Sequence, residues 1–154
     1  MVDIYAAVTA FLRSDEWPYS DMESGQVART AFKGDNGQFA CYAQARQEQQ
    51  QFIFYSVCPV TVPDGKRPLV AEFLTRANYG MILGNFEMDY RDGEVRYKTS
   101  IDSNGEDLSE GLIRPVVYSN VMMMDRYLPG IMKLVYGDSY DAEAAIAEIE
   151  NSGE

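Results

Sequence analysis

The chain has 154 residues, 46% of them hydrophobic and 24% charged, as expected for one globular domain with a sizeable core. It contains no histidine, which excludes the usual general base, the Ser-His and Cys-His arrangements and the commonest metal ligand. The net charge of −11 argues against binding to nucleic acid or to an anionic membrane, because both need a basic face.

The acidity is concentrated in two segments. Residues 14–24 carry four acids and no base, and residues 138–154 carry six acids and no base, whereas residues 25–137 are close to neutral. No apolar run reaches the ~18 residues of a membrane span, and the N-terminus lacks the basic segment of a signal peptide. We therefore expect a cytoplasmic protein with no nucleic-acid and no membrane partner.

Hydrophobic periodicity predicts a helix, three strands and a second helix in the first half of the chain. An apolar stripe at helical spacing, with Asp3 as N-cap, predicts a helix over 3–13. Runs of β-branched and aromatic residues then predict strands over 27–33, 39–46 and 51–57. A second helix begins near Pro68 and stops before Gly80.

Residues 83–102 are typical of one tight β-hairpin. Asp92-Gly93 is a preferred pair for a two-residue type I′ turn. That turn places three pairs of opposite charges on one face: Arg91 with Glu94, Asp89 with Arg96, and Glu87 with Lys98. We interpret this face as solvated, because each acid already has a basic neighbour.

A long apolar stripe predicts the third helix. Asp107 and Glu110 have the spacing of a capping box at its start. Pro115 is expected either to distort the first turns or to place the start near Arg114, and a second break is expected at Pro129.

The chain ends in a short acidic helix over 142–150 that Asp141 can cap, followed by a frayed acidic tail over 151–154. The order of elements is helix, three strands, helix, two strands, long helix and short helix. This order indicates a single α+β domain over 1–150, with an antiparallel sheet of about five strands and helices packed on it.

Motifs that carry chemistry are missing from the sequence. Its glycines match neither phosphate-binding pattern, and Cys41 and Cys58 do not have the spacing of a zinc motif. Two buried thiols are the expected interpretation of these cysteines. We expect no catalytic residue, no metal, no cofactor and no enzymatic activity; a histidine-free hydrolase that uses Asp or Glu is an alternative hypothesis.

Two features suggest contact with a partner. Residues 51–57 form an unbroken aromatic and β-branched run, which favours a central strand that is covered on both faces or lies at a dimer seam. Three successive methionines at 122–124 spread over about 200° of a helix, so they cannot all face one core; filling an irregular core is the alternative. The candidate partner-binding residues are Met122, Met123, Phe54 and Tyr55.

Four stretches resemble the YbjN-like family: N-Y-G at 78–80, L-G-N-F-E at 83–87, D-G-E-V-R-Y-K-T-S at 92–100, and Y-S-N-V-x-x-M-D-R-Y-L-P-G-I at 118–131. The resemblance is strongest over 67–150. It implies a bacterial sensory-transduction regulator with a fold like that of type III secretion chaperones, an α/β sandwich. Those chaperones are homodimers that hold a partner chain in extended form.

Our leading hypothesis is therefore a non-enzymatic, chaperone-like or regulatory domain that binds a partner protein through its sheet or helix surface and forms a homodimer. Strand edges that could accept a partner segment also favour it. The alternative is a small-molecule-binding sensory domain with an apolar pocket between sheet and helices.

Overall fold

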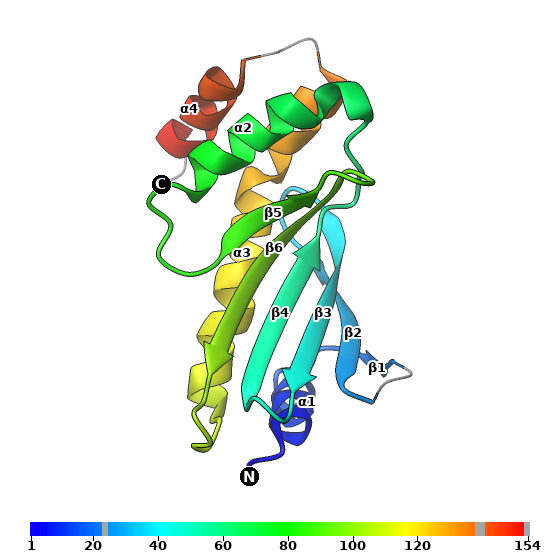
Figure 1. The fold of residues 1–154 in the computed structure, drawn as a ribbon, viewed down its shortest axis with the longest axis vertical. Helices are drawn as coiled ribbons and strands as arrows, with labels where there is room; N and C mark the ends of the chain where they lie inside the picture. The colour runs from blue at the N-terminus through cyan, green and yellow to red at the C-terminus, as the bar shows by residue number, and fades with distance from the viewer. Residues whose placement is uncertain (23–24, 138–140, 153–154) are drawn as a thin grey trace.

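The structure, a computed structural model, describes residues 1–22, 25–137 and 141–152. Over these residues, four α-helices and one antiparallel sheet form an α+β sandwich (Figure 1). The helices are α1 (Ile4–Ser14), α2 (Arg67–Asn78), α3 (Glu110–Tyr136) and α4 (Ala142–Ser152), with a short 3₁₀ helix, η1 (Asp64–Lys66), before α2. The strands are β1 (Ser20–Asp21), β2 (Val27–Lys33), β3 (Gln38–Arg46), β4 (Gln51–Val57), β5 (Asn85–Asp89) and β6 (Glu94–Asp102). The predicted α+β class is confirmed.

The sheet has the strand order β1-β2-β3-β4-β6-β5, and every neighbouring pair is antiparallel. Helix α3 runs behind the sheet along β4 and β6, and α1 packs beside it against β3 and β4 (Figure 1). Helices α2 and α4 pack against each other and against α3. Helices α1 and α3 therefore cover the sheet at its central strands, and α2 contacts the edge strand β5.

The sheet has six strands rather than about five, because the sequence gives no sign of β1. Ser20 pairs with Arg29 and Asp21 with Ala28, in the acidic segment between the predicted helix over 3–13 and the predicted strand over 27–33. A strand of two residues is too short to show the alternation by which strands are recognised.

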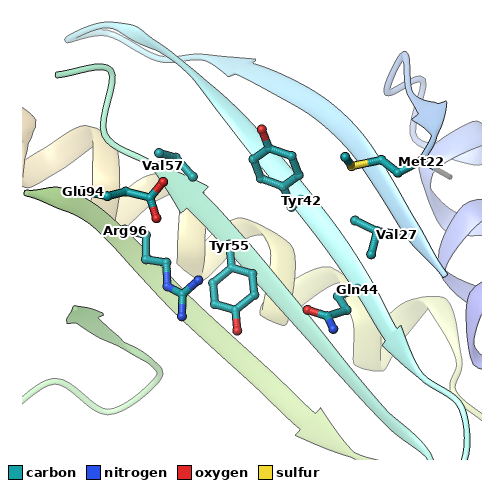
Figure 2. A pocket seen from close by; sticks show the side chains of 8 residues that line it. All are labelled: Met22, Val27, Tyr42, Gln44, Tyr55, Val57, Glu94 and Arg96. Atoms are coloured by element: carbon teal, nitrogen blue, oxygen red, sulfur yellow. The ribbon is translucent and has the colours of Figure 1, made fainter. Parts of the chain in front are cut away.

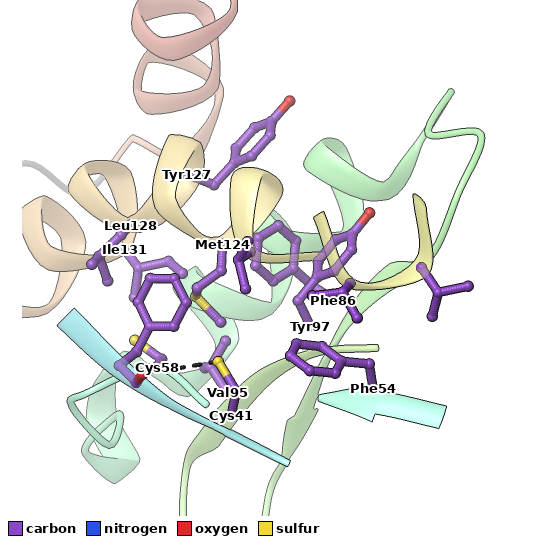
Figure 3. Close-up of a cluster of buried hydrophobic side chains, with 14 of the residues drawn as sticks. Cys41, Phe54, Cys58, Phe86, Val95, Tyr97, Met124, Tyr127, Leu128 and Ile131 are labelled. Atoms are coloured by element: carbon purple, nitrogen blue, oxygen red, sulfur yellow. Dashed lines mark hydrogen bonds between the residues drawn. The ribbon is translucent and has the colours of Figure 1, made fainter. Parts of the chain in front are cut away.

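The core lies between α3 and the inner face of the sheet. Cys41, Phe54 and Tyr97 are fully buried there, opposite Met124 and Ile131 of α3 (Figure 3). The intervening residues of β3 and β4 are only partly buried. The prediction that residues 51–57 form a central strand is thus confirmed, but within one chain only one of its faces is covered.

The β5–β6 hairpin has a different register from the predicted one. Glu87 pairs with Arg96 and Asp89 with Glu94, so four residues form the loop instead of two. The predicted pairs Arg91–Glu94, Asp89–Arg96 and Glu87–Lys98 are therefore wrong by two residues. A shift of two keeps every side chain on its predicted face, because side chains alternate with a period of two.

A tertiary contact explains this longer loop. The loop docks on the segment before α2: Val62 N donates to Gly93 O at 2.9 Å, and Arg67 donates to Tyr90 O at 2.9 Å. Gly93 has φ of +81°, and a Cβ there would lie 2.1 Å from Val62 O. The local preference of Asp-Gly for a two-residue turn yields to these contacts.

Helix α3 begins at Glu110 and its N-cap is Ser109, whose side chain accepts from Leu112 N, so the predicted cap at Asp107 is wrong. The helix is also continuous through Pro115 and Pro129.

Pro129 does not break α3 because the carbonyl that it leaves unpaired finds another donor. Proline at 129 cannot donate to the main-chain oxygen of Asp125, four residues earlier. Asn36 Nδ2 donates to that oxygen instead, at 2.9 Å. Leu128 and Ile131 on either side are buried in the core, which holds this turn against the sheet.

The short C-terminal helix is longer than predicted. Asp141 Oδ1 accepts from Ala144 N at 3.1 Å, which confirms the predicted cap. Helix α4 extends to Ser152, so Asn151 and Ser152 are helical rather than frayed. The last two residues of the predicted tail, 153–154, lie outside the described residues.

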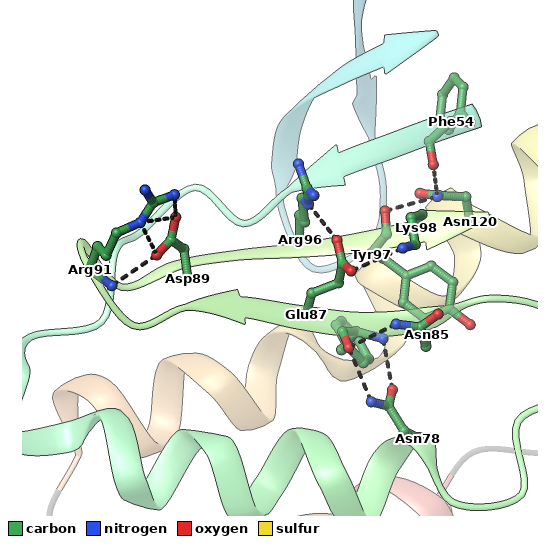
Figure 4. Close-up of polar contacts among 11 residues, drawn as sticks. Phe54, Asn78, Asn85, Glu87, Asp89, Arg91, Arg96, Tyr97, Lys98 and Asn120 are labelled. Atoms are coloured by element: carbon green, nitrogen blue, oxygen red, sulfur yellow. Dashed lines mark hydrogen bonds and ion pairs between the residues drawn. The ribbon is translucent and has the colours of Figure 1, made fainter. Parts of the chain in front are cut away.

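Asn120 is a fully buried polar residue at the α3–sheet interface (Figure 4). Its Nδ2 donates to the main-chain oxygens of Phe54 at 2.8 Å and Tyr97 at 3.0 Å, and its Oδ1 accepts from Ser56 Oγ. Since Phe54 lies on β4 and Tyr97 on β6, one amide fixes α3 on both central strands.

We predict that Asn120→Ala lowers the free energy of unfolding by about 2–4 kcal/mol, because it leaves several buried polar groups without a partner. Urea denaturation measures this change. Asn151→Ala, at an exposed position of α4, serves as the control and changes stability by less than about 0.5 kcal/mol. A loss below about 1 kcal/mol for Asn120→Ala would contradict the prediction.

Candidate functional site

The outer face of the sheet carries a shallow concavity of about 530 Å³ (Figure 2). We name it the sheet-face concavity, and it is lined by Met22, Val27, Tyr42, Gln44, Tyr55, Val57, Glu94 and Arg96. Tyr42 and Tyr55 are directly opposite each other on β3 and β4, and both are half-buried. Tyrosines that are partly exposed on a concave surface are typical of protein interfaces.

Arg96 positions one of these tyrosines. Its guanidinium carbon lies 4.1 Å from the centroid of the Tyr55 ring, within the range of a cation–π contact. Its Nε donates to Glu87 Oε1 at 2.6 Å, and Lys98 Nζ donates to the other oxygen at 3.0 Å (Figure 4). Burial raises the pKa of Glu87, but these two hydrogen bonds outweigh it and hold the pKa below its usual value. Glu87 is therefore paired with both Arg96 and Lys98; of the predicted charge pairs, the contact between Glu87 and Lys98 is found, although Arg96 is the residue directly opposite Glu87.

The free edge of β5 is closed by a side chain. Phe86 N donates to Asn78 Oδ1 at 2.7 Å, and Asn78 Nδ2 donates back to Phe86 O at 3.1 Å. An edge strand with these groups occupied cannot pair with an incoming strand at that residue. This finding weakens strand addition at β5 and favours contact through the face of the sheet.

A second hollow, of about 380 Å³, lies between the loop from α2 to β5 and helix α3. We name it the α2–β5 pocket. Its apolar lining includes Met81, Leu83, Met123 and Tyr127. The rim is also apolar, since Ile82 is 91% exposed.

Two polar atoms of the α2–β5 pocket have no hydrogen-bond partner. Ser119 Oγ and Arg126 Nε are both buried, and no described residue donates to or accepts from either atom. Buried polar atoms in folded proteins are nearly always paired, so these two atoms are candidate contacts for a bound ligand.

Two tyrosine hydroxyls flank this pocket. Burial, followed by a hydrogen bond to Glu150, raises the pKa of Tyr127 to about 12. Burial, followed by the charge of Tyr127, raises the pKa of Tyr97 to about 12, and its hydroxyl donates to Leu83 O at 2.6 Å. Both hydroxyls therefore stay protonated at neutral pH.

The structure places the four predicted partner-binding residues in four different environments. Tyr55 lines the sheet-face concavity and Met123 lines the α2–β5 pocket. Met122 is 55% exposed on α3, whereas Phe54 is fully buried in the core and offers no surface to a partner. The sequence did not identify Ser119 and Arg126 as site residues: both lie in the family-like stretch over 118–131, but that stretch is not a catalytic or ligand-binding signature.

The described part of the chain shows no arrangement of three or more Cys, Asp and Glu side chains that could hold a metal ion. Cys41 and Cys58 are free and buried, which confirms the prediction of two buried thiols. Burial raises the pKa of Cys41 to about 12 and that of Cys58 to about 11. None of the helices in the described ranges combines the length and hydropathy needed to cross a membrane.

Comparison with protein families gives one match. The model of the YbjN family, described as "putative bacterial sensory transduction regulator", matches residues 5–132. The chain belongs to the YbjN family. No curated protein matches it.

Several solved structures share the fold of this chain. YbjN from E. coli has a TM-score of 0.57 at 8% identity, covering 95% of this chain and 92% of that one. A chain of the HopA1–SchA chaperone–effector complex has a TM-score of 0.53 at 19% identity, covering 84% and 99%. A chain of the ExsC–ExsE complex has a TM-score of 0.54 at 11% identity, covering 82% and 91%. These likenesses show a shared fold and confirm the predicted YbjN-like, type III secretion chaperone-like architecture.

We predict that neither cysteine reacts with a thiol reagent at about pH 8 in the native protein, because a raised pKa and burial remove the thiolate. Labelling with Ellman's reagent is expected to be at least about a hundredfold slower than in the urea-unfolded chain. Ser100→Cys, at an exposed position of β6, provides a fast-reacting control. A native cysteine that labels at the unfolded rate would contradict the prediction.

Proposed function

We propose that this member of the YbjN family is a non-enzymatic, chaperone-like or regulatory domain that binds a partner protein through the open face of its sheet. The observation that carries the proposal is the sheet-face concavity, where two aromatic rings and aliphatic side chains lie uncovered on a concave surface. Cytoplasmic location is part of the same proposal.

Two further observations support this function. The fold is shared with chains crystallised in the HopA1–SchA chaperone–effector complex and the ExsC–ExsE complex, so this architecture occurs in assemblies of two proteins. The hydrogen bonds of Asn78 occupy the edge of β5 at Phe86, which favours side-chain contact over strand addition.

Tyr55 is the residue through which the proposal is best tested. We expect Tyr55→Glu to fold, because the new carboxylate lies beside Arg96 and opposite Lys98. The substitution removes the apolar contact between Tyr55 and the partner protein. Partner binding is therefore expected to weaken by about tenfold or more. Quantitative mass spectrometry of proteins captured from a lysate of the source bacterium measures this loss.

Tyr90→Glu is the matched control, since Tyr90 is 55% exposed in the β5–β6 loop and does not line the sheet-face concavity. The proteins that matter are those retained by the wild type and by Tyr90→Glu but lost from Tyr55→Glu. The proposal is overturned if Tyr55→Glu retains the same proteins, or if no protein is captured above background.

We also propose a homodimer, and light scattering behind a sizing column is expected to give twice the chain mass of 17.4 kDa. Tyr55→Glu should keep that mass, because the sheet face is assigned to the partner. A monomer at every concentration contradicts the dimer. A monomer for Tyr55→Glu alone would show instead that the sheet face is the dimer seam.

A second function, a small-molecule-binding sensory domain, is favoured by one specific observation. The α2–β5 pocket combines an apolar lining with two buried polar atoms that lack partners, which is the composition of small-molecule sites.

A further inference from the structure

The α2–β5 pocket contains an arginine, Arg126, whose Nε is bound by no described residue. Arg126 carries a guanidinium group, and within the described part of the chain it has no carboxylate partner. The ring of Tyr127 lies beside it, with the guanidinium carbon 5.4 Å from the ring centroid. Its Nε is buried and unpaired, so the pocket presents a donor that water does not reach freely.

Ser119 adds a second donor on the same side of α3. Positions 119, 123 and 126 are spaced by three to four residues, so they lie along one face of the helix. Side chains on a helix lean toward its N-terminus, which carries the guanidinium of Arg126 back toward Met123 and Ser119. Two donors with no protein acceptor therefore border one hollow, and an anionic group with two oxygens satisfies both.

The remaining walls favour an apolar body. Met81, Leu83 and Met123 supply flexible hydrocarbon and thioether surface, and Ile82 at the rim is almost fully exposed. Burying these groups against a hydrocarbon chain removes apolar surface from water, which is favourable by about 25 cal/mol per Å². A pocket with a charged group at one end and apolar side chains elsewhere fits an amphipathic ligand.

Glu150 is the one carboxylate among the described residues that line the pocket. It does not cancel Arg126, because Tyr127 donates to its Oε2 at 3.0 Å and the residue is exposed on α4. Water screens the exposed Glu150 carboxylate more than the buried Nε of Arg126, so the donor inside the hollow favours an anionic group there.

We propose that the α2–β5 pocket binds a small amphipathic carboxylate, with its head group on Arg126 and Ser119 and its apolar chain under the loop that contains Ile82 and Leu83. This inference deepens the second candidate function by naming its ligand class. It is independent of partner binding at the sheet-face concavity, which lies on the other face of the sheet.

The test uses decanoate as the probe, with decanol as the matched molecule that lacks the carboxylate. Isothermal titration calorimetry on the full chain measures affinity, and the ¹⁵N-resolved Nε–H signal of Arg126 reports contact at the site. We expect decanoate to bind, to shift this signal, and to bind at least about tenfold more tightly than decanol, since charge-assisted hydrogen bonds to the head group are lost in the alcohol.

Arg126→Met keeps an unbranched side chain that reaches as far as the arginine Nε but removes the charge, and is expected to weaken decanoate binding by about tenfold without changing decanol binding. Lys133→Met removes a cation from the same helix outside the pocket and is expected to change neither. The proposal is overturned if decanoate gives no heat and no Nε–H shift, if decanol binds equally well, or if Arg126→Met binds decanoate like the wild type. None of these outcomes alters protein capture by Tyr55→Glu, so failure here is distinct from failure of the partner-binding proposal.

Discussion

The rest of this structure depends on the fixed position of α3 against the two central strands. Asn120 sets that position, because its buried amide binds main-chain oxygens of both β4 and β6. A shift of α3 along the sheet is unfavourable, because it leaves this buried amide and its main-chain acceptors without hydrogen-bond partners. The turns of α3 beyond Asn120 therefore stay in place, and with them the residues that face the α2–β5 pocket.

A sheet covered on one face only has two chemically different sides. Alternation along β4 puts Phe54 in the core and Tyr55 on the outer face. Along β6, Arg96 lines the sheet-face concavity while the next residue, Tyr97, lines the α2–β5 pocket. One strand thus contributes to both surfaces, and the two proposed activities share a scaffold without sharing a site.

Membership of the YbjN family agrees with the observed fold. The solved structures are only 8–19% identical to this chain, so their likeness shows a shared fold and not a shared function. Function has to be argued from surfaces. The exposed aromatic face is suited to a protein, whereas the pocket with Arg126 is suited to a small anion. On the sheet face, Glu87 is held between Arg96 and Lys98.

The sequence by itself determined the class of the fold, because periodicity and caps are local signals. It placed the strands over 27–33 and 51–57, the cap at Asp3 and the faces of the hairpin. Tertiary structure decided the rest: the docking of Gly93 on Val62 set the hairpin register, and the amide of Asn36 kept α3 continuous at Pro129. It also created the α2–β5 pocket, because only folding brings the loop before β5 against α3, the helix that carries Arg126.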